Sequence, residues 1–244
     1  MQKEKLTDYL NIAISEINDG NMSYVWGNHQ EVLENRTKFL EKSGFDTNNC
    51  AVMSVTHGTD ILIADQSYRG KGMFDHSTAL KVDALMTQDP KIVLCLLIAD
   101  CLPIVFYDPK KNILALAHMG WKSTNEKLAM KLITLMKQKF GSNPKDIVVS
   151  IGPGIHKKSS IFPSPVLQEK TLNWQPYLKN LPNNQTSVDN LGYNYQQLLD
   201  SGIIAKNIEI NPIDTAQSPD YFSHYRSVRT GESEGRFMVA VRLK

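Results

Sequence analysis

The chain has 244 residues, of which 41% are hydrophobic, so it is long enough to bury a sizeable core. Its 27 basic and 25 acidic residues nearly balance, which excludes a broad basic surface for nucleic acid, and no apolar run approaches the ~18 residues of a membrane span. Three cysteines, an odd number, argue against a disulfide scaffold and for a reducing compartment. Acidic residues also interrupt the apolar stretch at the N-terminus, unlike in a signal peptide. We therefore expect a cytoplasmic protein without membrane or nucleic-acid partners.

One helix is clearly predicted in the first hundred residues. Asn28 can cap it, Glu31 stands three residues further on, and Gly44 ends it. The residues that follow helical spacing are Val32, Arg36, Phe39 and Leu40. The other predictions in this part are a helix or strand over residues 4–17, a strand over 51–58, a polar loop with at most a short strand over 65–82, and a buried strand over 91–99.

The best-marked helix is predicted over residues 123–141. Ser123 and Glu126 form a capping-box pattern, and Gly141 stops the helix. The remaining predictions are a hairpin with strands 104–108 and 113–118, a strand over 146–155, helices over 164–178 and 190–202, a strand or turn over 206–214, and a strand over 236–243. Because no repeat or Pro/Ser-rich linker divides the chain, the pattern favours one α+β domain over residues 1–244 with mixed sheets.

The hairpin carries a chemically reactive side chain at the outer end of each strand. A two-residue turn or a four-residue loop pairs Asp108 with Ile113 and places Cys101 opposite residue 120. One bulge or a shorter loop would instead bring it opposite His118 or its neighbour. Adjacent strands lie ~4.8 Å apart, so the thiol and the imidazole can share an ion such as zinc if they point to the same face.

The residues around this end of the hairpin favour an accessible site. Pro103 cannot donate a ladder hydrogen bond, so we expect this end of the strand at a rim. His118 leads directly into the predicted helix start at Ser123, whose free N–H groups and dipole favour an anion, and Lys122 adds a positive charge there. The alternative is that Cys101 is a small buried hydrophobe and Lys122 a solvated surface residue.

Other side chains are weaker candidates. His57 ends a predicted strand and would complete a catalytic zinc site with three protein ligands and one open position, but spacing alone does not select it over His76 or His224. Asp83 can hydrogen-bond a ligand histidine or only cap a turn. Asp100 can act as an acid or base, orient a ligand, or serve a structural role. Arginines that can reach an anionic substrate, or merely lie in a solvated loop, are Arg226 and Arg229.

The sequence resembles the laccase-domain proteins over roughly residues 24–244. The motifs that carry the resemblance occur in the family's order and are HGTDI, DALMT, ADCLPIVFYD, AHMGW, IGPGI and FSHYRSVRTGESEGR. Members have been called multicopper polyphenol oxidases and are now usually described as zinc-dependent purine nucleoside phosphorylases. Some bacterial members are linked to peptidoglycan editing.

This resemblance implies a single layered α/β/β/α domain with mixed β-sheets. It also implies a zinc ion held by His57, Cys101 and His118, which match the family's His-Gly, Asp-Cys and His-x-Gly-Trp positions. The implied activity is phosphorolysis of adenosine, inosine and methylthioadenosine, with adenosine deamination as a companion reaction. Copper is less expected, because the chain has only six histidines where a multicopper centre needs ~10.

The chain departs from the family pattern at three places, and other functions stay open. Lys122 stands where the family usually has Arg, and Asp214-Thr215 stands where it often has Cys-Thr. The segment HKKSSIFPSPV lacks the aromatic-Glu-Val sequence that is common there. The alternatives are a cysteine hydrolase using Cys101 and His118, a peptidoglycan-precursor editing role, and a non-catalytic binding protein. For the favoured function, Asp100, Cys101 and Lys122 are the expected catalytic residues. Lys122, Ser123 and Arg226 are expected to bind nucleoside or phosphate, in a monomer or small homo-oligomer.

Overall fold

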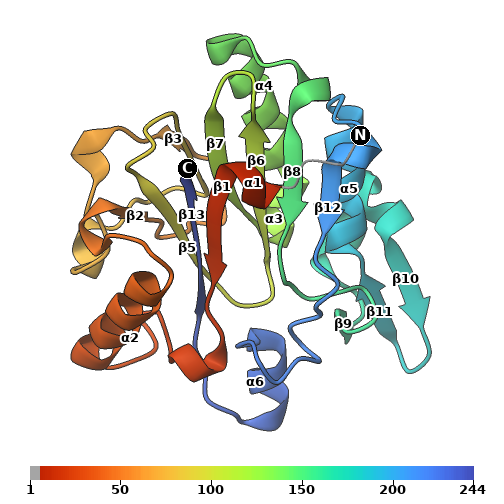
Figure 1. The fold of residues 1–244 in the computed structure, drawn as a ribbon. Helices are drawn as coiled ribbons and strands as arrows, with labels where there is room; N and C mark the ends of the chain where they lie inside the picture. Colours follow the sequence, from red (N-terminus) through yellow and green to blue (C-terminus); the bar gives the residue numbers. More distant parts are fainter. Residues whose placement is uncertain (1–5) are drawn as a thin grey trace.

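The computed structural model describes residues 6–244, and two β-sheets packed face to face lie at its centre (Figure 1). The four-stranded sheet has the order β1 (Leu10–Ile14), β13 (Phe237–Leu243), β5 (Val93–Ile98) and β2 (Cys50–Val52). The six-stranded sheet has the order β12 (Ile208–Ile210), β8 (Val148–Ile151), β6 (Leu102–Asp108), β7 (Ile113–Met119), β4 (Ala84–Thr87) and β3 (Ile61–Ile63). A small third sheet has the order β10 (Leu178–Leu181), β11 (Gln185–Val188) and β9 (Ile161–Pro163).

Side chains that alternate between the two faces of each strand pack the sheets and helices into layers. In β5, Leu94 and Leu96 face the six-stranded sheet and pack with Leu114 and Leu116 of β7, because successive side chains of a strand point to opposite faces. Cys95, between the first two, packs instead with the helix on the outer face. The expected α/β/β/α arrangement with mixed sheets is thus confirmed.

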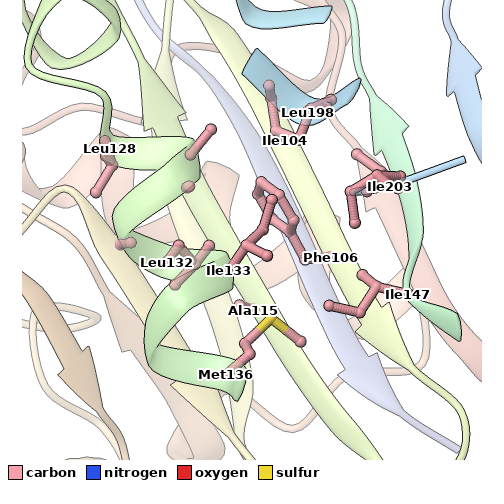
Figure 2. Close-up of a cluster of buried hydrophobic side chains, with 14 of the residues drawn as sticks. Ile104, Phe106, Ala115, Leu128, Leu132, Ile133, Met136, Ile147, Leu198 and Ile203 are labelled. Carbon is pink, nitrogen blue, oxygen red and sulfur yellow. The ribbon is translucent and has the colours of Figure 1, made fainter. Parts of the chain in front are cut away.

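Helices cover the outer face of each large sheet. Helix α2 (His29–Lys42) covers the four-stranded sheet, and α4 (Leu128–Phe140) and α5 (Asn190–Asp200) cover the six-stranded sheet (Figures 1 and 2). The other helices are α1 (Leu6–Tyr9), α3 (Trp121–Asn125) and α6 (His224–Thr230). Among residues 6–244, no helix has both the length and the apolar content to cross a bilayer.

Helix α2 has the predicted cap and buried face. Asn28 accepts hydrogen bonds from the N–H groups of Gln30 and Glu31. The predicted face is buried, and it includes the fully buried guanidinium of Arg36. This group donates to the carbonyls of Met22, Gly72 and Met73, and it stacks 4.1 Å from the ring centroid of Tyr24. No carboxylate within the described chain forms an ion pair with it.

The hairpin register is also as predicted. Asp108 pairs with Ile113, and the ladder continues without a bulge to Leu102 and Met119. The strands predicted over 91–99 and 236–243 correspond to β5 and β13, and the helix predicted over 190–202 to α5. The region 4–17, ambiguous in sequence, holds α1 followed by β1, with residues 4 and 5 outside the described part.

The prediction of one helix over residues 123–141 is wrong. The segment contains α3, a break at Lys127 with φ of 62°, and then α4, which ends at Gly141 as expected. Gly120, not Ser123, is the N-cap of α3, and no capping box with Glu126 forms. Ser123 lies one turn inside the helix, where its hydroxyl donates backwards to the carbonyls of His118 and Gly120.

The helix predicted over 164–178 is also wrong, because the segment forms two short 3₁₀ turns before β10. Pro176 cannot continue an α-helix, and Trp174 is buried and donates to Asn125 of α3. Strand β2 is shorter than the predicted 51–58. Strands β3, β4, β9, β10 and β11 were not predicted at all; they are short, and their alternation is too brief to detect in sequence.

Phe106 offers a test of the core between β6 and α4, where it is fully buried among the side chains in Figure 2. We expect Phe106→Ala to lower the free energy of unfolding by about 3–5 kcal/mol, because it leaves a cavity in a packed interior. Urea denaturation measures the change. The control is Phe74→Ala, at a ring that is 40% exposed, which should cost less than about 1 kcal/mol. Equal losses at both positions would contradict this placement of the core.

Candidate active site

Cys101 and His118 meet at the rim end of the β6–β7 hairpin. Leu102 pairs with Met119, so Cys101 comes opposite Gly120, just beyond the ladder. A Cβ atom added to Gly120 would lie 3.3 Å from Cys101 Sγ and 3.5 Å from His118 Nε2. The thiol and the imidazole nitrogen therefore both face the space that the missing side chain leaves open.

His57 reaches the same place from the loop after β2. Its ring centroid lies 4.9 Å from that of His118, and the two ring planes meet at 74°. The backbone of His57 has φ of 60°, a left-handed conformation that few residues other than glycine adopt. Such a conformation persists only where surrounding contacts hold it.

Asp83 supplies those contacts. Its fully buried carboxylate accepts hydrogen bonds from the backbone N–H groups of Thr56 at 3.1 Å, His57 at 3.0 Å and Gly58 at 2.8 Å. It also accepts from the Thr56 hydroxyl and, at 2.9 Å, from Nδ1 of His118. One carboxylate thus sets the loop that carries His57 and leaves Nε2 of His118 free to face Cys101.

The charges at this site are strongly coupled. Burial raises the pKa of Asp83, but hydrogen bonds from His118, Thr56 and Gly58 outweigh it and hold the pKa well below its usual range. Burial lowers the pKa of His118, but the adjacent Cys101 and the Asp83 carboxylate raise it to about 9. Burial and the neighbouring His118 lower the pKa of His57. The two imidazoles are therefore electrostatically different.

Two cavities meet at Cys101. The first, about 460 Å³, is named here the histidine cavity after His57, His76, His118 and His224, with Arg236 as its cation. The second, about 440 Å³, is named the aromatic cavity after Trp121, Phe162 and Tyr225. The residues that line both are Ala99, Cys101 and His224. The two cavities therefore adjoin at these three residues and present different side chains on either side of them.

Asp100 lies close to the site, but its carboxylate is already bound. Oδ1 accepts from the Thr215 hydroxyl at 2.7 Å, and Oδ2 accepts from the N–H of Tyr225 at 2.6 Å. Its backbone has φ of 72°, in the left-handed region that few residues other than glycine adopt. It therefore ties the loop at Thr215 and the first turn of α6 to the segment that carries Cys101.

The residues predicted to bind an anion do not gather around Cys101. Ser123 is fully buried and its hydroxyl is bound to backbone carbonyls. Arg226 donates to the carbonyls of Thr215, Ser218 and Tyr221 and to Glu232. Lys122 is exposed, with its ammonium 5.8 Å from the ring centroid of Trp121, and it lines neither cavity.

Three residues from one C-terminal motif also lie at the site; Arg236 was not selected from the sequence, whereas His224 and Arg229 were only weak candidates there. Arg236 lines the histidine cavity, and His224 lines both cavities and hydrogen-bonds Glu234. Arg229 lines the aromatic cavity, 3.4 Å from the ring centroid of Tyr225. Their common signal was their position in the motif FSHYRSVRTGESEGR, which marked the segment but not the individual side chains.

No ready-made metal cage is present within residues 6–244: no group of three or more His, Cys, Asp or Glu side chains is arranged to hold an ion as it stands. His57, Cys101 and His118 are nevertheless brought together, as the pairing and ring contacts show.

Two facing sheets between helices, with a thiol and two imidazoles at one strand-end rim, define a layered α/β protein with an edge site. The chain belongs to the family described as multi-copper polyphenol oxidoreductase laccase, whose model matches residues 12–244. This confirms the family resemblance that the motifs indicate.

Individual relatives agree with this membership. The chain is 30% identical over 220 residues to the purine nucleoside phosphorylase YlmD of Bacillus subtilis (strain 168), covering 88% of this chain and 78% of that one. It superposes on the crystal structure of the Bacillus licheniformis hypothetical protein YfiH with a TM-score of 0.86, 27% identity, and coverage of 96% and 93%. For YlmD from Geobacillus stearothermophilus the TM-score is 0.84, with 28% identity and coverage of 92% and 84%. Named relatives thus support an enzyme of the purine nucleoside phosphorylase kind.

Asp83→Asn tests whether this carboxylate organises the site. The amide keeps the size but cannot satisfy all the donors that now point at it, so we expect the free energy of unfolding to fall by about 3 kcal/mol. Chemical denaturation in the presence of a chelator measures the change. Asp75→Asn is the matched control, because Asp75 is an exposed helix cap and asparagine caps about as well. A loss at Asp83 no larger than at Asp75 would show that the network is dispensable.

Proposed function

We propose that this protein is a zinc-dependent purine nucleoside phosphorylase that acts on adenosine, inosine and methylthioadenosine, with adenosine deamination as a companion reaction. The observation that carries the proposal is the convergence of Cys101, His57 and His118 where the histidine cavity and the aromatic cavity meet. The names of the relatives support the same reaction class.

The donor types at the rim fit a catalytic zinc ion. One thiolate and two imidazoles form a donor set that zinc favours, and three protein ligands leave one position open to a small molecule. Asp83 binds Nδ1 of His118, the usual arrangement behind a zinc-bound histidine. His57 is exposed, so this side of the donor set is accessible from solvent. When bound, zinc would supply a positive charge that polarises an oxygen ligand.

The two cavities suit the two halves of the reaction. Flat aromatic rings and the guanidinium of Arg229 in the aromatic cavity offer stacking surfaces to a purine base. The histidine cavity holds Arg236 and is suited to phosphate. The donors of Ser123 and Arg226 are bound elsewhere. Within residues 6–244, Arg236 binds Glu234 and the Gly235 carbonyl through Nη1 alone, so we assign the anion to its remaining N–H groups.

A cysteine hydrolase is the second candidate, and one observation favours it. Asp83, His118 and Cys101 form a continuous series in which the carboxylate binds one ring nitrogen and the thiol faces the other. The raised pKa of His118, to about 9, suits an imidazolium beside a thiolate. Metal content separates this candidate from the phosphorylase.

Metal analysis and a product assay test the proposal together. We expect the purified protein to carry one zinc ion per chain and to convert adenosine and phosphate to adenine and ribose 1-phosphate. We expect Cys101→Ala to lose the zinc and at least about 100-fold in kcat/KM, because one of three ligands is removed. The control is Cys50→Ala, at a buried thiol packed under α2, which should retain both.

The opposite pattern would reject the phosphorylase. Rapid alkylation of Cys101 by iodoacetamide in metal-free protein, together with no phosphate-dependent release of purine, would favour the hydrolase. Full zinc loading without consumption of any purine nucleoside would instead point to a non-catalytic binding protein.

A further inference from the structure

His224 occupies a position that the proposed metal set does not use. It begins helix α6, at the bottom of Figure 1, and it is one of three residues that line both cavities. The other two are Ala99, which has no reactive side chain, and Cys101, assigned above to the metal. The imidazole is 57% exposed, so solvent can exchange protons with it.

Glu234 fixes the orientation of this imidazole. Both carboxylate oxygens lie 3.1 Å from Nδ1 of His224, while the described residues provide no hydrogen-bond partner for Nε2. The carboxylate is itself held by the hydroxyl of Ser227 at 2.5 Å and by Arg236. Burial raises the pKa of Glu234, but these hydrogen bonds outweigh it and keep the pKa below its usual value. A carboxylate at Nδ1 fixes the ring orientation and leaves Nε2 as the nitrogen that can exchange a proton with a ligand.

Cleavage of a nucleoside needs such a group. When the bond between C1′ and N9 breaks, its electron pair passes to the purine, which leaves more easily if a ring nitrogen receives a proton. Asp100, which lines the aromatic cavity, already accepts a hydrogen bond at each carboxylate oxygen. His224 is the proton carrier that both cavities share.

We propose that His224, oriented by Glu234, is the general acid that protonates the departing purine; this rests on the phosphorylase function proposed above. A phosphate oxygen bonds to C1′ while the C1′–N9 bond breaks and its electrons move to the purine. Nε2 of the imidazolium gives its proton to a ring nitrogen, and the base leaves neutral. The imidazole then regains a proton from the new phosphate monoester or from water. Glu234 is a positioning residue that acts through His224.

The test compares inosine with 7-methylinosine in the zinc-loaded protein. The methyl group gives the second base a positive charge, so it departs as a neutral molecule without an added proton. We expect His224→Gln to lose roughly 100-fold or more in kcat on inosine and less than about tenfold on 7-methylinosine. Glu234→Gln should show the same selectivity with a smaller loss, and Glu234→Asp should recover part of it. His29→Gln is the control, because His29 stacks on Tyr24 outside both cavities and should change neither rate.

Each other outcome contradicts the proposal in its own way. Equal losses on both substrates would mean that His224 binds substrate or supports the fold and does not donate a proton. No loss on either would remove His224 from the reaction. If the unmodified protein cleaves neither nucleoside, the phosphorylase function is wrong and the role of His224 is wrong with it. If the unmodified protein cleaves both nucleosides but the His224 variant loses the same activity on each, only the role of His224 is overturned.

Discussion

The buried carboxylate of Asp83 is the constraint on which the site depends. A charge in the interior is tolerated only when donors surround it, and here the donors come from the loop after β2 and from β7. Satisfying the carboxylate forces His57 into a left-handed backbone conformation and turns the ring of His118 toward Cys101. The hydrogen bonds that satisfy this buried carboxylate therefore position the reactive side chains, including His57 on its exposed loop.

The sheets supply the rest of the arrangement. Uninterrupted pairing along β6 and β7 carries the register from the turn at Asp108 and Ile113 to the rim, where Cys101 stands opposite Gly120. Residues on the two sides of this rim open onto different surroundings, one rich in imidazole and one rich in aromatic rings. Asp100 binds the first turn of α6 next to Cys101. This contact places His224, from the C-terminal part of the chain, at the wall between the two cavities.

The sequence predicts the features that depend on local periodicity and on the pairing register of the β6–β7 hairpin. The α2 cap and the pairing of Asp108 with Ile113 follow from spacing, whereas spacing left open whether Cys101 meets His118. The break between α3 and α4 at Lys127 does not follow from spacing. Nor does the role of Ser123, whose hydroxyl donates to backbone carbonyls at a position where the pattern predicted a helix cap. Side-chain contacts within an irregular loop leave no periodic pattern, and this is why the pairing of His224 with Glu234 and the hydrogen bonds of Arg226 appear only in the structure.

The guanidinium of Arg36 supports part of the wall of the histidine cavity. It binds the carbonyls of Met22, Gly72 and Met73, which adjoin the segments that bear Trp26 and His76 in that wall. Dissolved ions weaken attraction between exposed opposite charges, but this anchor is fully buried and bonds to neutral carbonyls. This part of the cavity should therefore keep its shape from low to high salt concentration. A lysine at position 36 could not replace the arginine, because its single ammonium group lacks the planar set of donors that binds two loops at once.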